Sequence, residues 1–140
     1  MPAQSRIDRA MIDTAKVWGD LSYCIRLKVG AVLSIDDRII ATGRNGMPMG
    51  SKSNVCECPD NHTKPQVIHA EMNAILFCAK YGIMTDGATL YVTHVPCSGC
   101  AASIFHAGIK RVVYGEDYRD MSGVKELENY GIKVEKLQEV

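Results

Sequence analysis

Two short segments contain the residues whose types and spacing could do chemistry: His69-Ala70-Glu71 and Pro96-Cys97-Ser98-Gly99-Cys100. One imidazole and two thiolates are typical zinc ligands, and three protein ligands leave the fourth position of a tetrahedral zinc open for water. Cys97 and Cys100 are three residues apart, so that in a first helical turn they face the same metal. Glu71 is the carboxylate that remains unligated, and it is available to move protons.

This set of groups is typical of zinc-dependent hydrolytic deamination of a nucleobase. Glu71 would take a proton from the activated water, deliver it to the ring nitrogen beside the attacked carbon, and later protonate the leaving amine. A thioredoxin-like dithiol is the main alternative for Cys97 and Cys100, but it leaves His69 and Glu71 unexplained. Singly, a helix-start histidine and a solvated glutamate are ordinary features; together the four residues predict deamination.

Composition limits the partners of this chain. With 140 residues, 46% hydrophobic content and a formal net charge of zero, it is expected to form a single domain, residues 1–140, that buries its own core. The absence of a basic excess disfavours long nucleic acid. The N-terminus has no signal-peptide pattern and no apolar run is long enough for a membrane, which predicts a cytoplasmic protein whose six cysteines are reduced.

The pattern of apolar residues predicts alternating helices and strands after an opening helix and hairpin. Right-handed crossovers would make the last strands parallel, giving a three-layer α/β/α domain with a mixed sheet of about five strands. A long irregular segment, 43–64, interrupts this order. The expected helices cover residues 5–23, 68–81, 97–108 and 121–130, and the expected strands cover residues 29–35, 38–42, 89–95, 111–114 and 132–137.

From Arg6 to Leu137 the chain resembles the deoxycytidylate (dCMP) deaminases of the phage and viral type, within the zinc-dependent cytidine and deoxycytidylate deaminases. Besides the two zinc segments, the resemblance rests on residues 27–32, 43–48, 69–77, 91–93 and 114–118. It implies a cytidine-deaminase-like fold and conversion of dCMP to dUMP and ammonia, which feeds thymidylate synthesis. Nucleoside deaminases usually carry Asn-x-Glu where this chain has Asn45-Gly46-Met47, and this departure favours a monophosphate substrate.

The resemblance also implies the residues that meet the substrate. Asn45 would hold the sugar; Arg26, Tyr118 and Ser98 would meet the phosphate, with Lys28 or Arg119 as further contributors. Ala70, within the zinc segment, is included among the substrate-binding residues. An arginine before a strand can offer a bidentate fork to a phosphate, although a solvated surface arginine is equally ordinary at such a position.

Regulation and assembly are implied by the family alone. Its members are commonly hexameric, activated by dCTP with Mg²⁺ and inhibited by dTTP, and segment 43–46 resembles the part that meets the effector. The expected effector-binding residues are Gly43, Arg44 and Gly46, where Arg44 replaces the aromatic residue usual in the family. If the protein is viral, its location would be the host cytoplasm.

A second, structural zinc is also predicted. Some viral-type relatives bind one with a cysteine that matches Cys24, another near Cys56, and residues of the long segment. Cys58 and His62 lie there in a Cys-x-Cys-x-x-x-His pattern and would complete four ligands. Scattered free thiols and a surface histidine are the alternative.

Two other functions fit parts of the sequence. The same chemistry could act on dCTP, cytidine, a tRNA base or a pterin-like ring, although the neutral charge disfavours tRNA. A non-catalytic zinc module would need only the three ligands, and Glu71 argues against it because a structural zinc site has no use for that carboxylate.

Overall fold

The computed structural model describes residues 3–138. Within this range the chain forms four helices and a five-stranded sheet with strand order β2-β1-β3-β4-β5. The strands are β1 (Gly30–Ile35), β2 (Arg38–Arg44), β3 (Thr89–His94), β4 (Arg111–Glu116) and β5 (Lys133–Lys136). The helices are α1 (Gln4–Gly19), α2 (Ala70–Tyr81), α3 (Ser98–His106) and α4 (Ser122–Asn129).

Strand direction divides the sheet into two parts. β1 pairs antiparallel with both β2 and β3, whereas β3, β4 and β5 are parallel. Parallel neighbours need a crossover connection, and α3 and α4 provide these crossovers. The carboxyl ends of β3 and β4 therefore meet at one edge of the sheet, and the mixed five-stranded architecture predicted from the sequence is confirmed.

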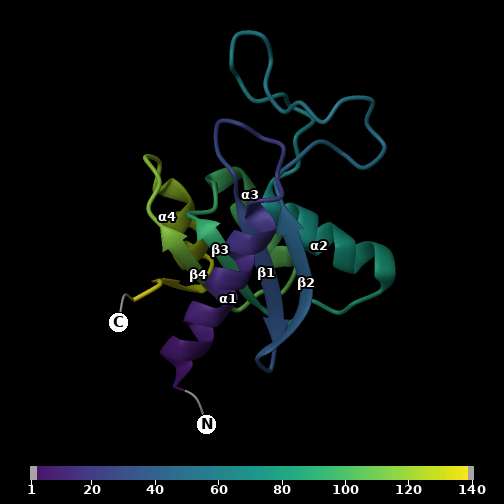
Figure 1. Ribbon diagram of the computed structural model, residues 1–140. Coiled ribbons are helices and arrows are strands. Elements are labelled where there is room, and N and C mark those ends of the chain that lie inside the picture. Colours follow the sequence, from purple (N-terminus) through teal and green to yellow (C-terminus); the bar gives the residue numbers. More distant parts are fainter. Residues whose placement is uncertain (1–2, 139–140) are drawn as a thin grey trace.

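Alternating side chains give the sheet a hydrophobic core on each face. Val32, Tyr91 and Val113 point to one face, where they pack with Met11 and Ile12 of α1. Their neighbours along the strands point to the opposite face, because successive strand residues alternate between faces. The core on that second face includes Leu33, Leu90, Val92, Val112, Ala74, Ile104 and Leu127, the last three from α2, α3 and α4. These are the three layers seen in Figure 1, where α1 crosses in front of the sheet.

Helix α1 differs most from its predicted bounds. It ends at Gly19, four residues before the expected end, and its N-cap is Ala3, so that Ser5 lies inside the first turn and does not cap it. Gly19 packs so closely on Gly30 that an added Cβ would lie 2.8 Å from the Gly30 nitrogen. This close approach brings the chain after α1 to the beginning of β1 and directs residues 20–29 over the end of the sheet.

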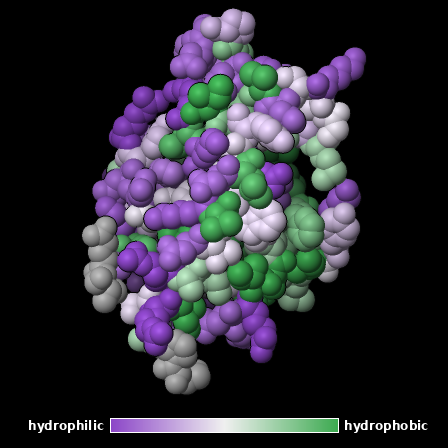
Figure 2. All heavy atoms as spheres, in the orientation of Figure 1, coloured by the Kyte–Doolittle hydropathy of each residue, from purple (hydrophilic) through white to green (hydrophobic). Residues whose placement is uncertain are grey.

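The segment between β2 and α2 extends away from the sheet, at the top of Figure 1. Two isolated bridges, Gly46 to Ile68 and Glu57 to Thr63, are the pairings that shape it. Hydrophobic and hydrophilic residues are mixed over the face shown in Figure 2. Among the described residues, some apolar side chains are largely exposed, including Ile25 and Met84. None of the helices in the described part of the chain is long and apolar enough to cross a membrane.

Candidate active site

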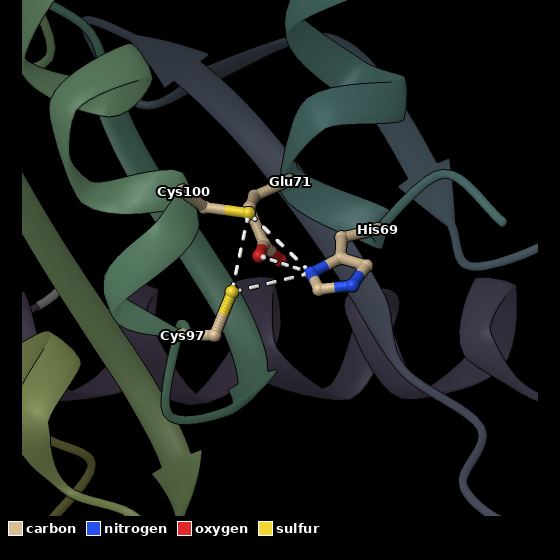
Figure 3. Close-up of side chains that lie close together, drawn as sticks. All are labelled: His69, Glu71, Cys97 and Cys100. Carbon is tan, nitrogen blue, oxygen red and sulfur yellow. Dashed lines mark hydrogen bonds and ion pairs between the residues drawn. The ribbon is translucent and has the colours of Figure 1, made fainter. Parts of the chain in front are cut away.

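Two helix starts bring the four predicted residues together. His69 is the N-cap of α2 and Cys97 the N-cap of α3, while Glu71 and Cys100 lie in the first turns of these helices. Both Sγ atoms lie 3.4 Å from Nδ1 of His69 and 3.5 Å from each other. Glu71 Oε1 lies 3.8 Å from the same nitrogen, and its side chain is only 4% exposed. Figure 3 shows the four side chains converging from the two helices.

The donor set fits a zinc ion. Zn–S bonds of about 2.3 Å and Zn–N bonds of about 2.0–2.1 Å in a tetrahedron separate the ligand atoms by about 3.6–3.8 Å. The separations of 3.4–3.5 Å between the three donors are close to this requirement. The carboxylate of Glu71 belongs to the same cluster, in which all donor atoms lie within 4.8 Å of one another. His69, Cys97 and Cys100 could therefore hold the metal, with Glu71 beside it.

Electrostatics within the cluster favours a cation. Hydrogen bonding with Cys100 and then with His69 lowers the pKa of Cys97 to about 4, and hydrogen bonding with Cys97 and then with Glu71 raises the pKa of His69 to about 10. The hydrogen bond with Cys97, followed by burial, raises the pKa of Cys100. A zinc ion requires neutral imidazole and thiolate ligands, so that binding would release protons from His69 and Cys100.

A pocket of about 480 Å³ opens beside this cluster. Its lining includes four of the five predicted substrate-binding residues, namely Arg26, Asn45, Ala70 and Tyr118, and also Arg119. Ser98 is exposed at the start of α3 and, like Lys28, lies outside the lining. The volume lies in the range of small-molecule sites. The lining of this pocket therefore contains residues of the candidate zinc site together with two arginines.

The side chain of Asn45 is partly committed to the backbone. Its Oδ1 accepts the N–H of Val29 at 2.9 Å, and its Nδ2 donates to the carbonyl of Leu27 at 2.8 Å. One amide hydrogen remains available to a ligand, because an amide nitrogen carries two. Asn45 therefore fixes the segment that follows Arg26.

The three predicted effector residues have different surroundings. Gly43 is buried against α2, where an added Cβ would lie 2.2 Å from the carbonyl oxygen of Ala70. This glycine is therefore needed for packing of α2 on β2, and its contact with an effector stays a prediction. Arg44 and Gly46 are partly exposed, and the Arg44 carbonyl accepts a hydrogen bond from Asn73 at 2.7 Å.

The cysteines of the predicted second zinc site are arranged differently from the prediction. Cys24 and Cys56 form a disulfide, whereas Cys58 is free and His62 is exposed beside Asp60. Disulfide sulfurs are not thiolate ligands, so the four-residue set is not assembled in this structure. The expectation that all six cysteines are reduced is also wrong for this pair. The sequence pattern carries no information on which cysteines the fold brings together.

Two pocket residues had no assigned role in the sequence. Glu57 is buried; its Oε2 accepts the N–H groups of Ile25 and Arg26 at 3.2 and 3.4 Å, while its Oε1 has no hydrogen-bond partner. His94 follows the last buried residues of β3 and lines the pocket near the metal cluster. No spacing pattern identifies Glu57, whereas a signal for His94 is available in its position three residues before Cys97.

Comparison with known proteins identifies the family. A model of the cytidine and deoxycytidylate deaminase zinc-binding region matches residues 5–116. The chain belongs to this deaminase family. The match includes both segments that supply the metal cluster, and it confirms the family predicted from the sequence.

Three relatives illustrate the similarity of this deaminase-family chain to other proteins. It is 48% identical to ComE operon protein 2 of Bacillus subtilis over 84% of its own length, and spans 64% of that protein. It is 36% identical to the deoxycytidylate deaminase of Enterobacteria phage T4, with 81% of this chain and 80% of that protein covered. The crystal structure of a dCMP deaminase from the cyanophage S-TIM5, in complex with dCMP and dUMP, superposes with a TM-score of 0.92 at 40% identity, covering 96% of this chain and 99% of that one.

Proposed function

We propose that this protein is a zinc-dependent deaminase that converts dCMP and water to dUMP and ammonia. The observation that carries the proposal is the nearly complete burial of Glu71 beside three donors at zinc-ligand separations. A purely structural site would not need this carboxylate. Relatives described as deoxycytidylate deaminases, including the cyanophage enzyme bound to dCMP and dUMP, support the choice of substrate.

Each residue of the cluster has a distinct task in this reaction. His69, Cys97 and Cys100 would hold a zinc ion, which when bound would acidify a water molecule and so supply the nucleophile. Glu71 accepts the proton of that water and transfers it to N3 of the cytosine ring as C4 is attacked. The same carboxyl group then takes up the second water proton and delivers it to the leaving amino group. Burial of Glu71 limits exchange of these protons with solvent.

The charged rim of the pocket supports a monophosphate substrate. Arg26 and Arg119 both line the pocket, and Tyr118 is a further lining residue that carries a hydroxyl group. Guanidinium groups bind phosphate through paired hydrogen bonds. We infer that Arg26, Arg119 and Tyr118 meet the 5′-phosphate, that the free amide hydrogen of Asn45 meets the sugar, and that the backbone at Ala70 borders the base.

Ammonia release from a panel of cytosine compounds tests this function. The purified protein with zinc would be given dCMP, dCTP, cytidine and deoxycytidine separately, with the same panel repeated in the presence of dCTP or dTTP as effectors. The proposal predicts the highest kcat/KM for dCMP. Equal turnover of deoxycytidine would contradict the phosphate site, and no ammonia from any compound would favour a non-catalytic zinc module.

Regulation, assembly and location are proposed with this function. We infer activation by dCTP, with Mg²⁺ as its counterion, and inhibition by dTTP, with Arg44 and Gly46 as the accessible candidates for effector contact. A homo-oligomer, expected to be a hexamer, is supported by partly exposed apolar side chains of α2 such as Leu76, Phe77 and Tyr81. Sedimentation of the protein with and without dCTP would measure its oligomeric state. The ammonia-release panel with dCTP or dTTP would measure the regulation. We also propose a cytoplasmic location.

A second metal site is proposed only for the reduced protein. The Sγ atoms of Cys24 and Cys56 and a carboxylate oxygen of Glu57 lie within 4.8 Å of one another, and Glu57 Oε1 is buried without a partner. Reduction would convert the two sulfurs to thiolate donors. Elemental analysis of reduced protein should then give two zinc ions per chain, and Cys24→Ser should give one. One zinc ion per chain in both the reduced wild-type protein and Cys24→Ser would refute the second metal site.

A further inference from the structure

His94 lines the same pocket as Tyr118 and Arg119. His94 pairs with Glu116 across the parallel strands β3 and β4, at the edge where these strands end. The backbone pairing of these strands ends with the N–H of Val95 donating to the carbonyl of Glu116 at 3.2 Å. Beyond this bond the chain leaves the sheet, and Tyr118 and Arg119 form part of the pocket wall.

Both ring nitrogens of His94 have partners. Nδ1 lies 2.8 Å from Oγ1 of Thr93, and Nε2 lies 3.2 Å from Oε2 of Glu116. Oγ1 of Thr93 also accepts the N–H of Gly30 at 3.2 Å, so that its own proton is available to His94. A carboxylate accepts but does not donate, which assigns the ring proton to Nε2 and leaves Nδ1 as the acceptor of the Thr93 hydroxyl. The hydrogen-bonded chain therefore runs from the β1 backbone to the Glu116 side chain.

Few other side chains hold this wall. Lys136 of β5 contacts Asp117 at 3.1 Å between exposed groups, and the guanidinium of Arg119 lies 5.6 Å from the centre of the Tyr118 ring. His94 is different because its side chain is only 16% exposed, whereas that of Glu116 is 62% exposed. A buried donor with a fixed ring orientation restrains its partner more than a contact between two exposed side chains does.

We propose that His94 is a positioning residue for the phosphate end of the pocket. Its imidazole, oriented by Thr93, holds the Glu116 side chain and thereby keeps Tyr118 and Arg119 in place to meet the nucleotide. This inference rests on the proposed function, because it requires a phosphate-bearing ligand in this pocket. His94 itself takes no part in proton transfer.

The test compares His94→Leu and Glu116→Ala with the wild-type protein. Each variant should raise the KM of dCMP and the inhibition constant of dUMP about five- to tenfold, within the range for loss of one ordinary hydrogen bond, because the lost contact acts on the ligand only through the pocket wall. The kcat should stay within about twofold. The inhibition constant of deoxyuridine, which lacks the phosphate, should not change. Glu116 is exposed, so Glu116→Ala keeps the test valid if His94→Leu fails to fold.

Coupling and control variants make the result specific. The double variant should be no worse than either single variant, because both remove the same interaction. His94→Gln, which can still donate to Glu116, should recover most of the affinity for dUMP, and His106→Leu, at the exposed end of α3, should behave as wild type. Additive effects, an unchanged dUMP constant in Glu116→Ala, or an equal loss of deoxyuridine binding would overturn the inference.

Nitrogen NMR of the His94 ring provides a readout that does not depend on turnover. The expected spectrum has the proton on Nε2, and Thr93→Val should change the Nδ1 resonance while Thr93→Ser should preserve it. A proton on Nδ1 with Nε2 unprotonated would overturn the proposed hydrogen-bonded chain. If the wild-type protein releases no ammonia from dCMP, the proposed function fails; normal wild-type turnover with unaffected variants refutes the role of His94 alone.

Discussion

Cys97 and Cys100 could bind one metal because a single helical turn separates them, and His69 approaches the same point from a second helix start. Each sulfur is 3.4 Å from the His69 Nδ1 atom. Removal of one of these three donors would leave a pair that no longer fixes a tetrahedral ion.

Cys97→Ser should weaken zinc binding by more than about a hundredfold, the upper range for loss of an outer-shell partner, because a neutral hydroxyl group replaces a thiolate ligand. Competition with a zinc chelator measures this affinity. Cys78→Ala is the matched control: Cys78 is a free, buried thiol in α2 whose pKa is raised by burial. Zinc affinity that falls equally in both variants would contradict the assignment of Cys97 as a ligand.

At the scale of residues, the sequence predicted the local part of the site. His69, Glu71, Cys97 and Cys100 are found from spacing because each pair belongs to one helix start. Glu57 lies in an irregular segment and contacts Ile25 and Arg26 more than 30 positions earlier, so that no periodic pattern could indicate it. The disulfide between Cys24 and Cys56 was missed for the same reason.

At the scale of elements, the packing of α2 on β2 determines where His69 and Glu71 lie. Gly43 permits this contact, since an added Cβ would be 2.2 Å from the Ala70 carbonyl oxygen and 2.8 Å from the Ala74 nitrogen. A larger residue must displace the N-terminal turn of α2. The metal cluster and the β2–α2 contact are therefore linked through one glycine.

Gly43→Ala should lower the free energy of unfolding by about 1–3 kcal/mol, the usual cost of overpacking a core, and also weaken zinc binding. Denaturant unfolding and chelator competition measure the two effects. Gly46→Ala, where nothing lies within 4 Å of the added carbon, should leave the unfolding midpoint unchanged. Equal stability of the two variants would show that α2 adjusts without cost.

A second contact between elements joins α1 to the face of the sheet on which this helix packs. Arg111 of β4 pairs with Asp8 of α1 at 2.7 Å and with Glu135 of β5 at 2.7 Å, and the Tyr91 hydroxyl donates to Asp8 at 2.9 Å. Burial would raise the pKa of Asp8, but hydrogen bonds from Arg111, Gln4 and Tyr91 outweigh it and lower this pKa. The ion pair therefore stabilises the fold only while Asp8 is ionised.

Asp8→Asn should cost about 3 kcal/mol of folding free energy near neutral pH, because Arg111 stays buried with one partner fewer. Since the pKa of Asp8 is lower in the native state, its contribution is complete above the unfolded value of about 3.9 and is lost as pH falls through the native value. Thermal unfolding from pH 7 to pH 2 should show the two proteins converging in acid. Asp13→Asn, on the exposed side of α1, should follow the wild type. A constant difference down to pH 2 would contradict this account.

Helix and strand order was predictable because each element has a regular apolar pattern, and β3, α3 and β4 begin at the predicted positions or within one residue of them. The end of α1 was not predictable, because it depends on the packing of Gly19 against Gly30, two residues that are separated in the sequence. Asp8 had no assigned role in the sequence, and the structure shows it as a buried partner of Arg111. Local patterns therefore predict elements, and the long-range contacts that end or join them require the structure.

At the scale of the molecule, the disulfide between Cys24 and Cys56 ties the chain after α1 to the long segment before α2. Both cysteines are buried, and Cys24 lines the pocket. The bond closes a loop with a sequence separation of 32. Chain entropy assigns such a loop about 3–4 kcal/mol of stabilisation.

Adding a reductant in buffer without added zinc should therefore lower the melting temperature of the oxidised wild-type protein. A double variant, Cys24→Ala with Cys56→Ala, should melt at a temperature that the reductant does not change. Calorimetry of both proteins, with and without reductant, makes the comparison. A wild-type protein that is insensitive to reductant would show that this bond contributes nothing to stability.

Glu71 is proposed to move the protons of a deamination reaction beside a zinc ion that His69, Cys97 and Cys100 would hold. Ammonia release from dCMP by Glu71→Gln, measured together with its zinc content, tests this role. We expect one zinc at this site, an unchanged fold and a kcat lower by about 10²–10⁴-fold, the contribution of a general acid–base group. Ammonia release at the wild-type rate by a zinc-loaded Glu71→Gln protein would refute the role of Glu71.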